Sequence, residues 1–250
     1  MEILEADGGF EIGTTTIPQE NADDLKSWFP GFSGYDVVIQ NCNSLGKRGS
    51  WPDAVKTGLE NFVSKGGGLY VYHGANNSFA EWPAYNDMIG LGWRKKDFGP
   101  AITVVDGKIK RIPKGQGGDT RHGARFDAVV TSRANHPIHR NFPPSWKAAD
   151  IEVYRYARGP AKRLNVISYA TDPETQIDFP IEWTVLFGEG RVYNSTYGHY
   201  MGKQEDNPPG VQCAAFQTIL VRATYWLAKK PVSPKVPDDF PTSEAISLRQ

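Results

Sequence analysis

DAVKTGLENFVSKGGGLYVYHGANNS, residues 53–78 of this 250-residue chain, predicts a helix, a glycine break, a buried strand and a polar loop in succession. Apolar residues recur at helical spacing after Pro52, which suits a first helical turn. The glycines Gly66–Gly68 end the helix, and the β-prone run Leu69–Tyr72 is typical of a central parallel strand. Ligands of open α/β sheets bind outside the carboxyl ends of such strands. We therefore expect His73 and the loop after it to lie beside a ligand.

Other segments extend this pattern into one α/β domain. Strands are predicted at residues 10–16, 35–40, 126–131, 150–155, 165–170, 180–183 and 191–196, with hairpins around 106–107 and 188–189 and helices at 1–7, 21–28 and 211–227. The length of the chain suits a single core. We expect one domain over residues 1–230, followed by a proline-rich tail over 231–250 that wraps the surface or is loose.

The charge balance, the cysteine content and the lack of long apolar runs limit the class of protein to which the chain can belong. The chain has 28 basic and 28 acidic residues, so its charge favours neither nucleic acid nor an anionic membrane as a partner. Cys42 and Cys213 form neither a disulfide framework nor a metal-binding pair. No apolar run is long enough to cross a bilayer, and Glu2 and Glu5 rule out a signal peptide in the chain as it stands. We expect a small-molecule ligand and a cytoplasmic location, or an exported or periplasmic one if the N-terminus is truncated; the oligomeric state is not predicted.

Histidines carry the strongest chemical signal. Four of the five fall in predicted loops or at strand ends, namely His73, His122, His136 and His199. Pro137 holds the preceding residue, His136, in extended backbone. In Asp150–Arg155, strand alternation would put Glu152 and Tyr154 on one face. Plainer interpretations also fit, because His136 could fix a turn and a solvent-facing strand would show the same alternation.

Six segments, taken in order, resemble the ThuA-like (trehalose utilisation) family, whose fold is similar to that of class I glutamine amidotransferases. They are YDVVIQNCN at 35–43, LENFVSKGGGLYVYHGANN at 59–77, NHPIHRNFP at 135–143, DIEVYR at 150–155, PxxW at 180–183 and GEGRVYNSTYGH at 188–199. The resemblance implies a flavodoxin-like, three-layer sandwich with a mainly parallel sheet. In the family a strand and a polar loop precede the helix predicted here at residues 1–7. We therefore expect either a truncated chain or a sheet that lacks an inner strand.

The resemblance also implies a role in carbohydrate catabolism, on a disaccharide or keto-sugar, by an isomerase, lyase or hydrolase reaction. The candidate catalytic residues are His73, His136, Glu152 and His199. The candidate substrate-binding residues are Asn76, Trp82, His122, Tyr154 and Trp183, because aromatic faces stack on sugar rings while amides and imidazoles bond hydroxyls. The same aromatic residues would serve equally well in a core.

Two kinds of chemistry suit such a cluster. Histidines and a carboxylate can act as general acids and bases, or they can bind a divalent metal such as zinc. Neither HxxxH nor HExxH spacing is present, so no metal ligand is assigned. Glutaminase activity is not expected, because His73 stands at the strand–helix elbow where that reaction needs a cysteine. The alternative is a non-catalytic carbohydrate-binding or structural module.

Overall fold

The computed structural model describes residues 1–18, 23–43, 51–200 and 208–249. Its helices are α1 (Glu2–Asp7), α2 (Asp23–Ser27), α3 (Asp53–Ser64), α4 (Pro83–Ile89), α5 (Pro209–Gln212) and α6 (Ala214–Leu227), with 3-10 turns η1 (Phe32–Gly34), η2 (His73–Asn77) and η3 (Pro137–His139). The strands are β1 (Val37–Gln40), β2 (Gly68–Tyr72), β3 (Ala101–Val105), β4 (Lys108–Ile112), β5 (Phe126–Ser132), β6 (Ser145–Ile151), β7 (Leu164–Thr171), β8 (Asp178–Phe187) and β9 (Gly190–Ser195).

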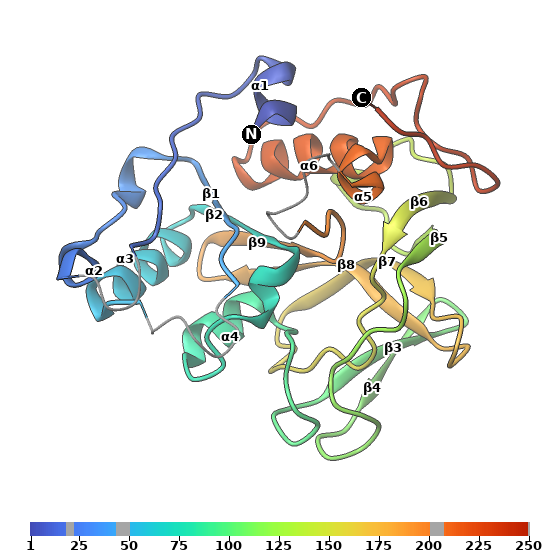
Figure 1. The fold of residues 1–250 in the computed structure, drawn as a ribbon, viewed down its shortest axis with the longest axis horizontal. Helices are drawn as coiled ribbons and strands as arrows, with labels where there is room; N and C mark the ends of the chain where they lie inside the picture. Colours follow the sequence, from blue (N-terminus) through green and yellow to red (C-terminus); the bar gives the residue numbers. More distant parts are fainter. Residues whose placement is uncertain (19–22, 44–50, 201–207, 250) are drawn as a thin grey trace.

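The strands form one mixed sheet in the order β1-β2-β9-β8-β7-β5-β6, and the β3–β4 hairpin joins it through β8 (Figure 1). Only the β1–β2 and β2–β9 pairs are parallel among the described strands. The other pairs run antiparallel, so the expectation of a mainly parallel sheet is wrong. The reason lies in the connections. Two-residue turns such as Gly188-Glu189 can join only antiparallel strands, whereas helix α3 provides the crossover that a parallel pair needs.

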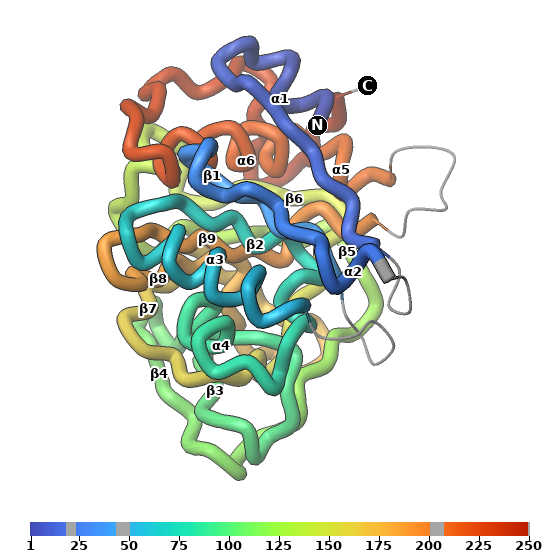
Figure 2. Tube along the Cα trace, turned by 90° about the vertical axis from the view of Figure 1, so that its left-hand side faces the viewer, coloured from blue at the N-terminus to red at the C-terminus, as the bar shows by residue number. Residues whose placement is uncertain are grey.

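Helices cover both faces of this sheet, as the α/β prediction requires (Figures 1 and 2). On one face α6 packs Phe216, Ile219 and Ala223 into a core shared with Tyr70 and Tyr193. On the other face α3 and α4 form a second core, which includes Val55, Leu59, Val63, Tyr85 and Met88. The buried stripe of α3 therefore has the spacing that the sequence predicts.

Most of the expected elements are present, with three local differences. Helix α3, the Asp106-Gly107 hairpin and the β8–β9 turn follow the prediction. Residues 10–16 form no strand. Only Asp150 and Ile151 of the expected strand at 150–155 lie in a strand, β6, which begins at Ser145. The expected helix at 211–227 is divided at Cys213, whose backbone is not helical (ψ 118°).

Strand β1 lies at one end of the sheet, paired in register with β2. The sheet thus has no gap between β1 and β2 in the part of the chain that the structure describes. The other edge of β1 pairs with no strand among the described residues, so an unpaired edge, the liability expected for a sheet without an inner strand, is present there.

The residues after α6 pack on the domain. The Lys147 amide donates to the Thr242 carbonyl, and the Phe240 ring lies 4.2 Å from the Phe142 ring, measured between centroids. The tail therefore wraps the surface, one of the two arrangements expected for it. None of the helices in the described ranges is long and apolar enough to span a membrane.

Candidate functional site

His73 sits at the elbow where β2 ends and η2 begins. Its φ is +36°, a left-handed value that strains a residue with a large side chain. The turn is fixed by the Asn76 side-chain amide, which donates to the His73 carbonyl at 3.1 Å. His73 is only 5 % exposed. The backbone thus holds this imidazole in one position at the carboxyl end of a central strand.

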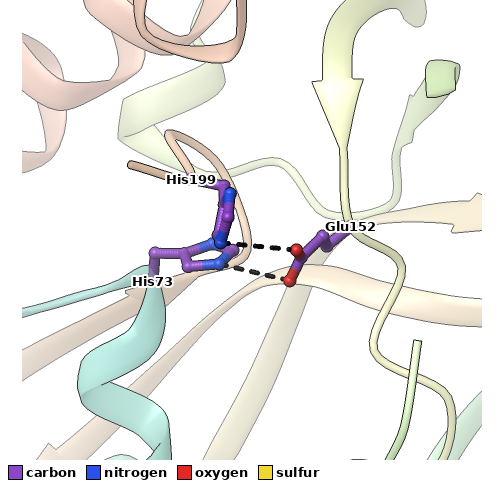
Figure 3. Close-up of side chains that lie close together, drawn as sticks. All are labelled: His73, Glu152 and His199. Carbon is purple, nitrogen blue, oxygen red and sulfur yellow. Dashed lines mark ion pairs between the residues drawn. The ribbon is translucent and has the colours of Figure 1, made fainter. Parts of the chain in front are cut away.

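A buried carboxylate and a second imidazole meet His73 from two other segments (Figure 3). His73 Nε2 lies 3.3 Å from Glu152 Oε2, and His199 Nε2 lies 3.6 Å from Glu152 Oε1. Glu152 follows β6 directly, and His199 lies four residues after β9. The sheet explains this convergence. Strand β8 pairs antiparallel with both β9 and β7, so β9 and β7 run in the same direction. Strand β5 pairs antiparallel with both β7 and β6, so β6 runs in that direction too. Strands β2, β9 and β6 therefore all point their carboxyl ends at the same edge.

Two further predicted residues border this cluster. His122 Nε2 lies 3.8 Å from Glu152 Oε1, and the Tyr154 hydroxyl lies 3.3 Å from His73 Nε2. Trp93 packs edge-on against both, with ring centroids 5.6 Å from His122 and 5.3 Å from Tyr154. The His122 side chain is 38 % exposed, whereas those of His73 and Glu152 are each 6 % exposed. The cluster is thus closed on the His73 side and reaches solvent near His122.

The backbone orients His73 through its other ring nitrogen. His73 Nδ1 lies 3.0 Å from the Thr196 carbonyl oxygen, which can only accept a hydrogen bond. Nδ1 therefore carries a proton, and Nε2 is the atom through which the ring exchanges protons with Tyr154, Glu152 or a ligand.

The surroundings keep Glu152 ionised. Burial alone would raise the pKa of its carboxyl, but the hydrogen bond and charge of His73, with the charges of His199 and His122, hold that pKa below its usual value. Burial raises the pKa of the Tyr154 phenol, and the Glu152 charge raises it further. Burial lowers the pKa of His199; Glu152 opposes this effect, while His73 and Arg125 add to it. At neutral pH a carboxylate thus lies beside a neutral His199.

The donor atoms are also spaced as metal ligands would be. One nitrogen each from His73 and His199 and one oxygen from Glu152 all lie within 4.8 Å of one another. Two imidazoles and a carboxylate are a donor set that zinc accepts. The described residues could therefore hold one divalent cation, provided that both Nε2 atoms offer a lone pair.

The structure does not bring His136 into this cluster. Strand β5, which leads to His136, runs antiparallel to β6 and so ends at the opposite edge of the sheet. The His136 ring packs on Trp226 of α6 instead, with centroids 4.8 Å apart. An argument from converging carboxyl ends holds only for parallel strands, which explains the difference.

Three predicted substrate-binding residues are buried in the fold. Trp82 Nε1 donates to Glu60 Oε1 at 2.5 Å, and the Trp82 ring stacks on Tyr85. Trp183 is fully buried and donates from Nε1 to the Ile89 carbonyl. Asn76 is also fully buried, and its Oδ1 has no hydrogen-bond partner among the described residues. The two tryptophans thus have the core role that the sequence left open for them.

The sequence reasoning missed several residues beside the cluster. Arg125 lies 2.7 Å from His199 Nδ1 and 3.1 Å from Asp150 Oδ2, in each case through Nη1. Trp93 and the Thr196 carbonyl were also missed. Arg125 can be placed near the cluster only when the strand pairing is known. Strands β5 and β6 are antiparallel, so the residue that precedes β5 lies at the edge where β6 ends.

Comparisons with known proteins agree with this fold. The model of the ThuA family, described as trehalose utilisation, matches residues 2–227. A solved ThuA-like protein from Parabacteroides merdae is 31 % identical with a TM-score of 0.91, over 99 % of this chain and 89 % of that chain. Another from Bacteroides uniformis is 18 % identical with a TM-score of 0.50, over 82 % and 75 % of the two chains, and shows a likeness of fold. No curated protein matches the sequence. These findings confirm the resemblance seen in the sequence, and the chain belongs to the ThuA (trehalose utilisation) family.

Proposed function

We propose that this protein is an enzyme of carbohydrate catabolism that acts on a disaccharide or keto-sugar by general acid–base chemistry. One observation carries the proposal: two imidazoles, His73 and His199, flank the same buried carboxylate, Glu152, at an edge of the sheet. Burying an ionisable cluster costs free energy that a purely structural role does not require at such an edge. The family match supports carbohydrate as the substrate class.

The orientation of His73 suits it for the role of general base. The Thr196 carbonyl accepts a hydrogen bond from Nδ1–H, so Nε2 can accept a proton from a bound substrate. The neighbouring Glu152 carboxylate stabilises the imidazolium that this transfer creates. Strain at φ +36° and burial hold the ring still, which limits the reorganisation needed during the reaction.

A keto-glycoside would give this centre a suitable reaction. A carbonyl acidifies the C–H bond beside it, so His73 would take that proton and the electron pair would form a carbon–carbon double bond. The glycosidic C–O bond would break, His199 would donate a hydrogen bond to the leaving oxygen, and the proton that His73 received would pass to that oxygen. Returning the proton to the former carbonyl carbon, while a hydroxyl proton moves to the former carbonyl oxygen, would give isomerisation instead. His122 and Trp93, which are both partly exposed, lie where they could bind the sugar, whereas Tyr154 is buried behind them.

No glutaminase activity is proposed. In the strand–helix elbow that would hold a nucleophilic cysteine, this chain places His73. Cys213 lies in the core beneath α6, and Cys42 is buried too, so neither thiol occupies that position.

The test is turnover of trehalose, related disaccharides and their 3-keto forms, followed by proton NMR. His73→Gln, Glu152→Gln and His199→Gln should each reduce kcat by about 10²–10⁴-fold. His136→Asn, outside the cluster, should keep wild-type kcat. Thermal unfolding would establish that each variant is folded.

Other outcomes would separate the competing functions. Wild-type kcat in all three cluster variants would contradict the proposal. Sugar binding without turnover would support the carbohydrate-binding module. Plasma mass spectrometry would also measure the metal content of the purified protein. A near-stoichiometric divalent metal, lost in both His73→Ala and His199→Ala, would favour metal-assisted chemistry over acid–base catalysis by the side chains alone.

A further inference from the structure

The contact between Arg125 and His199 has a fixed direction. Arg125 Nη1 lies 2.7 Å from His199 Nδ1. A guanidinium has only N–H donors and stays charged in proteins, so in this contact Arg125 donates. His199 Nδ1 must therefore accept, which means that it carries a lone pair and no proton.

The other nitrogen of His199 follows from this. A neutral imidazole has one N–H group and one lone pair, so a ring that accepts at Nδ1 carries its proton at Nε2. This atom points at Glu152 Oε1 from 3.6 Å. A proton on Nε2 suits that approach, because it faces a carboxylate that can only accept.

His73 has the opposite tautomer. Its Nδ1 donates to the Thr196 carbonyl, so its Nε2 has the lone pair in the neutral ring. In the neutral rings the two Nε2 atoms thus differ. That of His73 has a lone pair, which can accept from the Tyr154 hydroxyl at 3.3 Å, and that of His199 has a proton, which faces Glu152. This difference is what a base and a hydrogen-bond donor acting on one substrate require.

We propose that Arg125 is a positioning residue that fixes His199 in the Nε2–H tautomer and thereby makes it the hydrogen-bond donor of the cluster. The assignment of the donor role rests on the proposed function, whereas the tautomer itself does not.

The position of Arg125 is itself fixed. Its Nη1 forms an ion pair with Asp150 Oδ2 at 3.1 Å. Asp150 has φ +54°, and its backbone amide donates to Asp127 Oδ1 at 3.1 Å. A positive φ at a non-glycine residue persists only where its surroundings impose it. The end of β6 is therefore shaped so that Asp150 aims its carboxylate at Arg125.

The same contact works against a metal at this cluster. A metal bound at His199 Nε2 needs the lone pair of that atom, and the ring would then carry its proton on Nδ1. That proton would face the N–H of Arg125. A three-ligand metal site therefore requires Arg125 to leave His199, and the arrangement found here leaves His73 and Glu152 as the ready ligands.

Nitrogen NMR tests the proposal directly. Protein labelled with ¹⁵N-histidine, free of substrate and at a pH of about 8, where an unperturbed imidazole is neutral, reports the tautomer of each ring through two-bond ¹H–¹⁵N correlations. The His199 signals are identified by their loss in His199→Gln. We expect the Nε2–H tautomer in the wild type and a mixed or reversed population in Arg125→Met.

Two variants serve as controls. Arg125→Lys keeps a cationic donor and should retain the Nε2–H tautomer. Arg249→Met removes an arginine that pairs with an aspartate elsewhere, Asp239 at 2.7 Å, and should leave the His199 signals unchanged.

Two results would overturn the proposal. One is an Nδ1–H tautomer of His199 in the wild type, and the other is an unchanged Nε2–H tautomer in folded Arg125→Met. Because the measurement uses protein without substrate, loss of the proposed reaction would not affect it. A wild-type Nε2–H signal that depends on Arg125, in a protein without turnover, would reject the function and keep the role of Arg125.

Discussion

His139 Nε2 lies 3.2 and 3.1 Å from the two carboxylate oxygens of Glu182, in the core beneath α6. Glu182 also accepts hydrogen bonds from Ser168 and from Tyr193, at 2.5 and 2.6 Å. Burial would raise the pKa of Glu182, but the charge of His139 and these hydrogen bonds hold it below its usual value. The molecule thus contains a second histidine–glutamate pair, fully enclosed, to compare with the pair of His73 and Glu152.

His139→Leu should strongly destabilise the fold. It leaves the fully buried Glu182 carboxylate without the imidazole that faces both of its oxygens. Breaking one half of a buried pair costs about 3–5 kcal/mol, and urea unfolding would measure this loss in the free energy of unfolding. The double variant His139→Leu/Glu182→Leu should recover much of it. A loss below about 1 kcal/mol in the single variant would show that the hydrogen bonds alone satisfy Glu182.

His136 should make stability depend on pH. Burial, followed by the charges of His139 and Arg191, lowers the pKa of His136 to about 4, although Glu182 opposes the shift. In the unfolded chain its pKa is about 6.5, so between these values the unfolded state binds a proton that the folded state does not. The contribution of His136 to stability therefore declines as the pH falls below about 6.5, and the decline is complete near pH 4.

The variant His136→Asn isolates this effect. Its Oδ1 can replace Nδ1, which accepts from the Ile138 amide at 3.4 Å, and it does not titrate. From pH 7 to pH 5 the wild type should lose about 2 kcal/mol more unfolding free energy than the variant. Parallel curves for the two proteins would contradict a lowered pKa of His136.

The sequence predicts the local elements better than the directions of the strands. Helix α3, strand β2 and the turn at Gly188 follow from periodicity and glycine placement, all of which are local signals. The family resemblance favoured parallel strands, and nothing in the periodicity of β5, β7 or β8 argues otherwise. Short connections determine the direction of β7, β8 and β9, since chain reversal within a few residues forces antiparallel pairing, whereas residues 133–144 between β5 and β6 leave the direction open.

The sequence predicts which residues meet in the site only where it predicts the direction of the strands that carry them. His73, Glu152 and His199 end strands that share one direction, so the argument from strand ends holds for them. His136 follows β5, which runs the other way, and the same argument fails. Glu152 was found for a partly wrong reason, because β6 ends at Ile151 and no alternating strand carries it. Arg125 could not be predicted, because its place depends on where β5 begins relative to β6.

Tyr154→Phe should separate positioning from proton transfer. The hydroxyl lies 3.3 Å from His73 Nε2, whereas the ring packs on Trp93 and stays in place in phenylalanine. The raised pKa of Tyr154 keeps its proton on the phenol, so Tyr154 serves as a hydrogen-bond donor to His73 rather than as the base. We expect a loss of about 0.5–1.5 kcal/mol in unfolding free energy and a fall in kcat of about tenfold, well short of the loss in His73→Gln.

Tyr85→Phe is the matched control, because the Tyr85 hydroxyl donates hydrogen bonds to Gln40 and to the Ala75 carbonyl. This variant should reduce stability and leave kcat unchanged. If Tyr154→Phe instead abolished turnover as fully as His73→Gln, Tyr154 would take over from His199 the role of donor to the leaving oxygen.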